Sequence, residues 1–137
     1  MAKYVIFPDV ALRLAAENAV LPAEHKLLAP TLLRSQLLAR LYQLVREGAL
    51  TKKEAEQHLN YVRGLRMRLL GDRVLQQVAW KIAAQLAWPD TLDAEYVALT
   101  QLQADALVSF DEDIIAAVTD LVAVAPYEAL LRADAAP

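Results

Sequence analysis

The stretch Tyr4-Val5-Ile6-Phe7-Pro8-Asp9, near the start of the chain, decides the fold. Its first part is an unbroken apolar run with aromatic and β-branched side chains, which is typical of a short strand buried on both faces. Asp9 follows at once, and a helical spacing of apolar residues begins at Val10. A buried strand that leads through an acid directly into a helix indicates an α/β layer.

The same pattern returns late in the chain. Ala106–Phe110 is a second buried apolar run, and Asp111 follows it directly at the start of a short helix. Parallel strands of this kind need helical crossovers between them, and the intervening sequence is rich in helical spacing. Three more segments are candidate strands: Leu27–Ala29, Leu65–Leu70 and Leu121–Val124.

Helices are expected between these strands. The strongest candidate is Thr31–Glu47, which Gly48 ends. Thr51 and Glu54 have the spacing of a capping box at the start of the next helix. Strands that alternate with helices predict an α/β fold with a mainly parallel sheet. The expected helices are Val10–Asn18, Thr31–Glu47, Thr51–Arg63, Asp72–Leu86, Asp90–Leu102 and Asp111–Val118.

Length and composition set the class of protein. With 137 residues we expect a single domain spanning 1–137, with a frayed tail after Leu131. A hydrophobic fraction of 57% excludes intrinsic disorder. The absence of cysteine excludes a disulfide scaffold and a thiolate zinc site. A net charge of −3 argues against a non-specific nucleic-acid coat protein.

Membrane and export signals are not recognisable in the sequence. No uncharged apolar run approaches the ~18 residues of a membrane span. The N-terminal apolar run ends at Pro8, and it is too short for a signal-peptide core of about 7–15 residues. We therefore expect a cytoplasmic protein without a membrane partner.

Three acids are the candidate functional residues. Asp9 and Asp111 each follow a buried strand, and Asp93 opens a helix just before the second of these strands. Each acid alone is explained by helix capping or by the helix dipole. If the strands are neighbours, however, the carboxylates meet at one edge of the sheet, where ligands bind in such folds. Clustered hard oxygen ligands suit Mg²⁺ or Mn²⁺, so we expect the three to converge on a metal.

Four segments also carry a family resemblance. The most specific is Asp93-Ala94-Glu95-Tyr96-Val97-Ala98-Leu99, and the others depend on their order and spacing. The four are Val5–Leu12, Leu28–Leu37, Leu92–Leu99 and Ala106–Asp111. Together they resemble the PIN-domain ribonucleases, specifically the VapC-type toxins of bacterial toxin–antitoxin pairs, over nearly the whole chain.

The resemblance implies a PIN-like three-layer α/β/α fold and a metal-dependent cleavage of RNA. Asp9, Asp93 and Asp111 would be the catalytic acids and would bind one or two Mg²⁺ or Mn²⁺ ions directly or through water. The metal would lower the pKa of a water that attacks the phosphodiester and would offset charge on the leaving oxygen. Asp113 is either an outer partner of this site or a first-turn helix acid.

Two positions depart from the family pattern. Gln36 stands where the family usually has Glu, and Ala11 stands where it commonly has Ser or Thr. An amide oxygen can bind a metal or its water, so Gln36 remains a possible ligand, but it carries no charge and cannot act as a base. The alternative function is therefore a catalytically weak or inactive PIN-like module that binds RNA or protein. A further alternative is a helical interaction module whose acids are only caps.

The basic and aromatic residues have two interpretations each. The arginines either contact RNA phosphates or form solvated faces, and those considered for RNA binding are Arg34, Arg40, Arg66 and Arg68. The aromatic residues are expected to be core or interface anchors rather than base-stacking platforms. These are Trp80, Trp88, Tyr42 and Tyr96.

Partners are expected from the apolar composition and from the resemblance. A small domain with this hydrophobic fraction exposes apolar patches, which usually mark partners. We expect a homodimer or a complex with a small antitoxin, besides an RNA substrate. The helices at Thr31–Glu47 and Thr51–Arg63 are the candidate docking faces.

Overall fold

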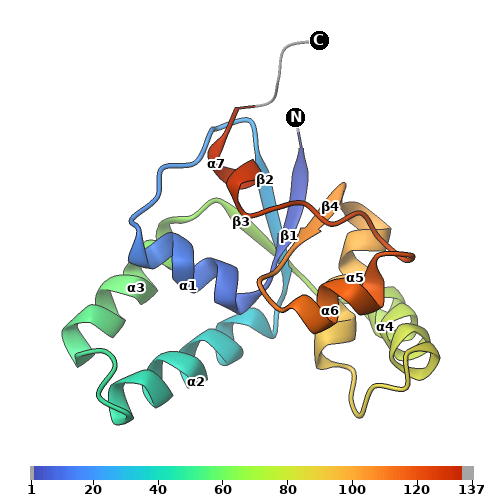
Figure 1. Ribbon diagram of the computed structural model, residues 1–137, viewed down its shortest axis with the longest axis horizontal. Coiled ribbons are helices and arrows are strands. Elements are labelled where there is room, and N and C mark those ends of the chain that lie inside the picture. Colours follow the sequence, from blue (N-terminus) through green and yellow to red (C-terminus); the bar gives the residue numbers. More distant parts are fainter. Residues whose placement is uncertain (1, 134–137) are drawn as a thin grey trace.

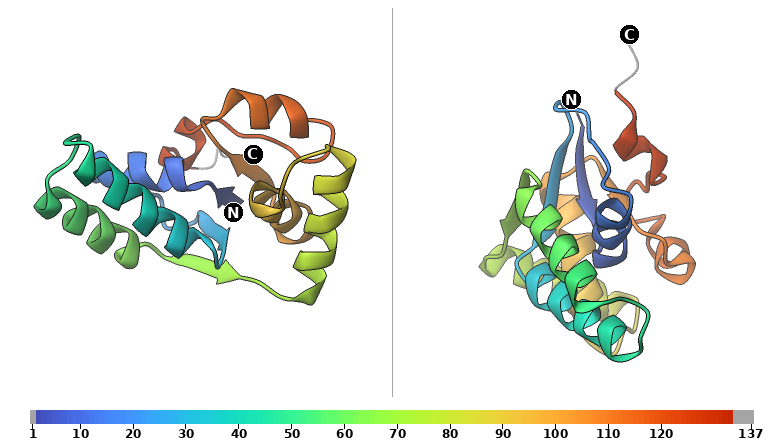
Figure 2. Two further views of the ribbon diagram at one scale, coloured as in Figure 1. Left: turned by 90° about the horizontal axis from the view of Figure 1, so that it is seen from below. Right: turned by 90° about the vertical axis from the view of Figure 1, so that its left-hand side faces the viewer.

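The computed structural model describes residues 2–133, which form one four-stranded sheet with helices on both faces (Figures 1 and 2). The strands are β1 (Lys3–Ile6), β2 (Lys26–Pro30), β3 (Met67–Leu70) and β4 (Ala106–Val108). The helices are α1 (Pro8–Ala16), α2 (Leu33–Arg46), α3 (Lys52–Gly64), α4 (Arg73–Gln85), α5 (Leu92–Gln103), α6 (Glu112–Val118) and α7 (Glu128–Leu131).

The sheet has the order β3-β2-β1-β4, and every pairing in it is parallel. Strand β1 lies between β2 and β4, with Tyr4 opposite Leu27 on one side and Ala106 on the other. Because the strands are parallel, their carboxyl ends share one edge of the sheet. The expected α/β fold with a parallel sheet between helices is confirmed.

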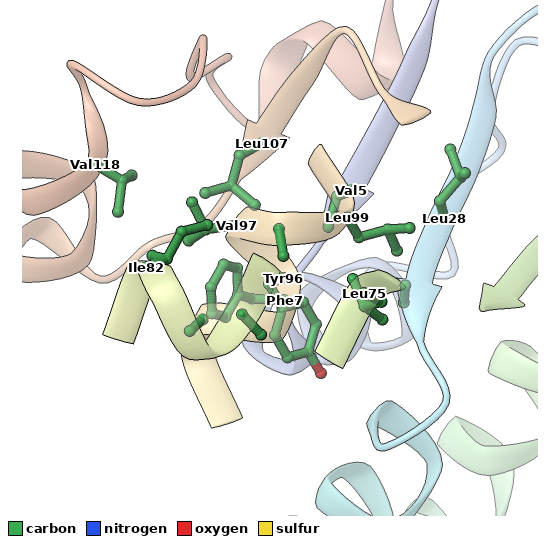
Figure 3. Close-up of a cluster of buried hydrophobic side chains, with 14 of the residues drawn as sticks. Val5, Phe7, Leu28, Leu75, Ile82, Tyr96, Val97, Leu99, Leu107 and Val118 are labelled. Atoms are coloured by element: carbon green, nitrogen blue, oxygen red, sulfur yellow. The ribbon is translucent and has the colours of Figure 1, made fainter. Parts of the chain in front are cut away.

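Alternate residues of β1 face opposite layers. Val5 and Phe7 pack into a cluster with residues of α4 and α5, and the Phe7 ring stacks on Tyr96 with ring centroids 4.3 Å apart (Figure 3). Tyr4 and Ile6 pack on the other face against α1 and α7. The continuous apolar run of β1 is therefore the expected result of burial on both faces.

Helices α2 and α3 form an antiparallel pair beside the sheet (Figure 2). Thr51 and Glu54 form the expected capping box, with each side chain bonded to the other residue's backbone N–H. A small third cluster of Leu37, Leu41 and Ala55 holds the pair together. Helix α2 begins at the same sheet edge as α1, because it follows β2 as α1 follows β1.

The expectation of a strand at Leu121–Val124 is wrong. This segment makes a single parallel bridge to β4, between Leu107 and Val124. The N–H groups of Leu121 and Val122 are bonded to the Val118 carbonyl, which makes the first half of the segment a turn. Pro126 has no N–H and cannot extend the pairing on the other side.

Some helix boundaries also differ from expectation. Helix α1 begins at Pro8 rather than Val10, since proline is well suited to the first helical position. It ends at Ala16, because Asn18 adopts φ 46° and the Ala19 N–H bonds back to the Leu14 carbonyl. Helix α7 was not expected. The tail prediction falls mainly on residues 134–137, which lie outside the described residues.

The aromatic residues divide into two groups. Tyr96 is fully buried, and Trp88 packs partly buried against the main cluster, as expected of core anchors. Trp80 and Tyr42 are 71% and 61% exposed, so neither is a core residue. None of the helices described is long and apolar enough to cross a membrane.

The burial of β4 predicts how a substitution in this strand changes the free energy of unfolding. Leu107 is fully buried, and Leu107→Ala should lower the free energy of unfolding by about 3 kcal/mol through lost transfer energy and a residual cavity. The control is Leu38→Ala, at a position that is 58% exposed, where we expect a change within ~0.5 kcal/mol. Urea denaturation measures both, and equal effects would contradict the burial of Leu107 in the core.

Candidate functional site

Asp9 lies at the carboxyl end of β1, in the first turn of α1. It is not the N-cap, which is Phe7 and makes no side-chain capping bond. Its carboxylate accepts hydrogen bonds from the backbone N–H of Val10, at 2.8 Å, and of Phe110, at 3.2 Å. The second bond ties the end of β1 to the loop that follows β4. The explanation of Asp9 as a simple cap is therefore wrong.

Asp111 lies just beyond β4 and is the N-cap of α6. Its Oδ1 accepts hydrogen bonds from the backbone N–H groups of Asp113, at 3.0 Å, and Ile114, at 3.2 Å. Its own N–H donates to the hydroxyl of the buried Ser109. These bonds explain why the chain turns into a helix here, and they fix Asp111 near Phe110, to which Asp9 is bonded.

Asp93 lies in the first turn of α5 and shares a surface hollow with other acids. The hollow has a volume of about 180 Å³. Its lining residues are Trp88, Pro89, Asp90, Asp93, Asp111, Asp113 and Ile114. Two acids that are far apart in sequence, Asp93 and Asp111, thus meet at the carboxyl edge of the sheet. Asp113, given two possible roles, lines the hollow as well.

The charges of the three candidate acids influence one another. Burial raises the pKa of the Asp9 carboxyl against the lowering effect of its N–H partners, and the charge of Asp111 raises it further. Burial also raises the pKa of Asp93, and the charges of Asp90, Asp111 and Asp9 add to this. Nearby like charges disfavour ionisation, so the neighbouring carboxylates add to the effect of burial on Asp9 and Asp93.

The expected convergence of three carboxylates on one metal ion is not seen. Among residues 2–133, no group of three or more His, Asp or Glu side chains is placed closely enough to hold a metal ion. The physical reason lies in the bonds described above, because Asp9 faces the Phe110 N–H and Asp111 faces the start of α6. What the fold does bring together is a pair, Asp93 and Asp111, with Asp9 beside them.

Gln36 of α2 contacts Tyr96 of α5. Its Oε1 accepts a hydrogen bond of 2.6 Å from the Tyr96 hydroxyl. Burial raises the pKa of Tyr96 far above its usual range, and Asp93, Glu95 and Asp9 raise it further. The amide therefore faces a neutral hydroxyl that lies among the site's acids.

The arginines do not form one surface. Arg34 is exposed on the first part of α2, close in sequence to Gln36, whereas Arg40 lies further along the helix and bonds to Gln43. Arg66 and Arg68 line a different hollow, beside Lys3 and the first residues of β2, at the opposite ends of the strands. The last two are therefore remote from the acidic edge.

One residue of the hollow was not expected. Asp90 lines it, and its Oδ1 accepts a hydrogen bond from the Leu92 N–H at the start of α5. The available signal was its spacing of three residues from Asp93, which suggested only a helix start. The two histidines take no part, since His25 and His58 are absent from the lining of the hollow.

Comparisons with known proteins support the fold and give no information on the function. A scan against models of protein families finds no match, and a search of curated proteins finds none either. Among solved structures, the chain is similar to PAE2754 from Pyrobaculum aerophilum, with a TM-score of 0.71 and 20% sequence identity. The similarity covers 95% of this chain and 93% of that one.

The raised pKa of Asp93 predicts the effect of Asp93→Asn on stability. The folded-state pKa of Asp93 lies above its pKa in the unfolded chain. The stabilising contribution is therefore complete below the unfolded pKa and is lost as pH rises through the folded pKa. Without divalent metal, the Asn variant should melt at a higher temperature than the native protein at pH 7, and this gain should shrink at pH 3.5. Thermal unfolding monitored by circular dichroism measures it.

Glu56→Gln, on the exposed face of α3, is the matched control for the loss of one negative charge. We expect it to change stability by no more than ~0.5 kcal/mol at pH 7. An equal gain in both variants would show that net charge, rather than the crowded acidic edge, is responsible.

Proposed function

We propose that this protein is a metal-dependent ribonuclease, the cytoplasmic toxin of a toxin–antitoxin pair. One observation carries the proposal: Asp93 and Asp111 share a hollow at the carboxyl edge of a parallel sheet. Asp9 is bonded to the loop beside them. Ligands of α/β sheets bind at this edge, and these are the acids that the resemblance to PIN-domain ribonucleases implies. The parallel fold is consistent with that resemblance.

The donor chemistry of the hollow fits Mg²⁺ or Mn²⁺. Its charged side chains are all carboxylates, which are hard oxygen ligands. Magnesium is usually held by one or two carboxylates and keeps several waters, so it does not need three acids in direct contact. Asp93 and Asp111 would hold the ion, and Asp9 and Asp113 would contact its waters. When bound, the ion supplies a water of lowered pKa and offsets charge on the leaving oxygen.

The surrounding residues prepare the site. The N–H groups of Phe110 and Val10 favour the ionised form of Asp9 against its burial. The stacking of Phe7 on Tyr96 fixes the start of α5, and thus Asp93, against the end of β1. Arg34, which is exposed on α2, would contact an RNA phosphate in this proposal.

A second function, a PIN-like module with weak or absent catalysis, is favoured by Gln36. Its amide oxygen is bonded to the Tyr96 hydroxyl, and it supplies no charge to a metal. The third alternative, in which the acids are only caps, explains Asp111 but not Asp9. A metal-dependent cleavage assay distinguishes these functions.

The candidate docking surface for the antitoxin lies on this protein, between α2, α3 and β3. A groove of about 510 Å³ lies there, with Arg34 and Arg63 among its lining residues. Its apolar lining residues are Leu33, Leu37, Leu38, Leu59, Val62, Met67 and Leu69. This groove is the surface that we propose an apolar helix of the antitoxin covers. Self-association into a homodimer is proposed on the same composition grounds.

The decisive experiment is a metal titration of RNA cleavage. The native protein should cleave a long single-stranded RNA with Mg²⁺ or Mn²⁺ and should be inactive with EDTA. Asp93→Asn and Asp111→Asn should each lower the rate at least about 100-fold, since each removes a charged ligand. Glu56→Gln is the control and should keep native activity.

A metal-binding measurement separates inactivity from a wrong site. At about 10 mM Mn²⁺ the melting temperature of the native protein should rise, because an ion that binds only the folded state stabilises it. Asp93→Asn should lose most of this rise. Metal-independent activity, or cleavage unchanged in both Asn variants, would overturn the proposal.

Gln36→Glu distinguishes a weakened nuclease from an inactive module. A carboxylate at this position can still accept the Tyr96 hydroxyl bond and adds a negative charge to the acidic edge. For a nuclease, the variant should need several-fold less Mg²⁺ for half-maximal cleavage than the native protein. For an inactive module, the substitution alone should restore little, since Ala11 remains. Identical metal dependence in an active native protein and variant would place Gln36 outside the site.

A further inference from the structure

A row of cationic side chains crosses the amino-terminal edge of the sheet. In the parallel register, Lys3 of β1 lies opposite Lys26 of β2. Arg66 immediately precedes Met67, which lies opposite Leu27, so Arg66 continues the row to the third strand. Arg68, two residues further on, faces the same side of the sheet as Arg66. The row is at the opposite ends of the strands from the acidic edge (Figure 1).

These cations line one hollow, which we call the basic hollow. Its volume is about 300 Å³. The residues around it are Lys3, Ala23, His25, Lys26, Leu27, Leu28, Arg66, Arg68 and Gln103. Gln103 is the last residue of α5, so the hollow is closed on one side by a helix end and on the other by the strand starts. This size fits a mononucleotide or a short stretch of nucleic-acid backbone.

One wall of the basic hollow is rigid. His25 is buried, its ring lies edge-on to Tyr4 at 5.3 Å, and its Nε2 is hydrogen-bonded to the Arg132 carbonyl. Its backbone N–H is bonded to the Pro22 carbonyl. The loop that carries Lys26 into the sheet is thus held in place, which preorganises the cations beside it.

The basic hollow carries an excess of positive charge. Like charges placed directly opposite on neighbouring strands are destabilising. Asp105 accepts a hydrogen bond from the Lys3 backbone N–H and supplies one negative charge at this edge. Four cationic side chains line the hollow, however, in a chain whose net charge is −3. The local positive excess therefore opposes the charge of the protein as a whole.

We propose that the basic hollow is a binding site for a phosphate ester. Arg66 and Arg68 supply planar guanidinium groups that bind phosphate oxygens in pairs, and Lys3 and Lys26 supply point charges. The amide of Gln103 can bond to a sugar or base. The site needs no metal, and it holds whether or not the acidic edge is a nuclease. Free nucleotides and RNA backbone share this chemistry, and the experiment separates them.

The test is a direct binding measurement in EDTA. EDTA removes divalent metal ions, so metal-dependent binding or cleavage at the acidic edge does not contribute. Three probes are titrated into the full-length protein at 150 mM salt: pyrophosphate, ATP and a fluorescently labelled ten-nucleotide polyuridine. We expect at least one to bind. Arg66→Gln combined with Arg68→Gln should weaken that binding at least about tenfold. The matched control combines Lys52→Gln with Lys53→Gln, which removes the same charge from the exposed start of α3 and should change affinity less than twofold.

The three probes identify the source of the phosphate. Binding of pyrophosphate and ATP supports a free nucleotide, and binding of the oligonucleotide alone supports RNA backbone. Nuclear magnetic resonance gives a second readout, in which the amides of Lys26, Arg68 and Gln103 should shift on addition of the bound probe. Absence of binding by all three, or equal weakening in the two double variants, would overturn the proposal, and neither outcome bears on metal-dependent cleavage.

Discussion

Strand β1 is hydrogen-bonded along both edges and buried on both faces, and the rest of the structure is arranged around this constraint. Its pairing with β2 and β4 fixes the parallel order of the sheet, because both neighbours run in its direction. Its alternating side chains require a helical layer on each side. The two ends of the parallel strands differ in charge, because four aspartates line the hollow at the carboxyl ends and four cationic side chains line the hollow at the amino ends.

The acidic edge is stabilised by backbone groups rather than by cationic side chains. The Phe110 N–H holds Asp9, and two N–H groups of α6 hold Asp111. Asp93 lies among their charges, and its pKa rises as a result. In the proposed function, a bound cation would relieve this repulsion. The same bonds hold Asp9 and Asp111 against different backbone groups, so Asp93 and Asp111, which line one hollow, are the pair that we propose would hold an ion.

Most of the architecture could be predicted from the sequence, because it depends on local patterns. The run Tyr4–Phe7, the capping box at Thr51 and the acids after each strand all indicate their structures directly. The segment Leu121–Val124 could not be assigned, since its apolar composition suits a strand while its N–H bonds to Val118 make it a turn. The sequence could place Gln36 near the acids, but not its bond to Tyr96, because the direction of a side chain depends on tertiary packing.

The position of β4 has a consequence for the synthesis of the protein. Lys3 and Asp105 are bonded across 102 positions of the chain. During synthesis, β1 must therefore wait for β4 before its second edge is covered. A nascent chain therefore exposes an open strand edge, which is prone to pairing with other chains. Asp111 is made later still, and the acidic edge is incomplete until then. If the protein is the proposed toxin, a chain that has not yet reached Asp111 lacks part of its acidic edge and would be inactive.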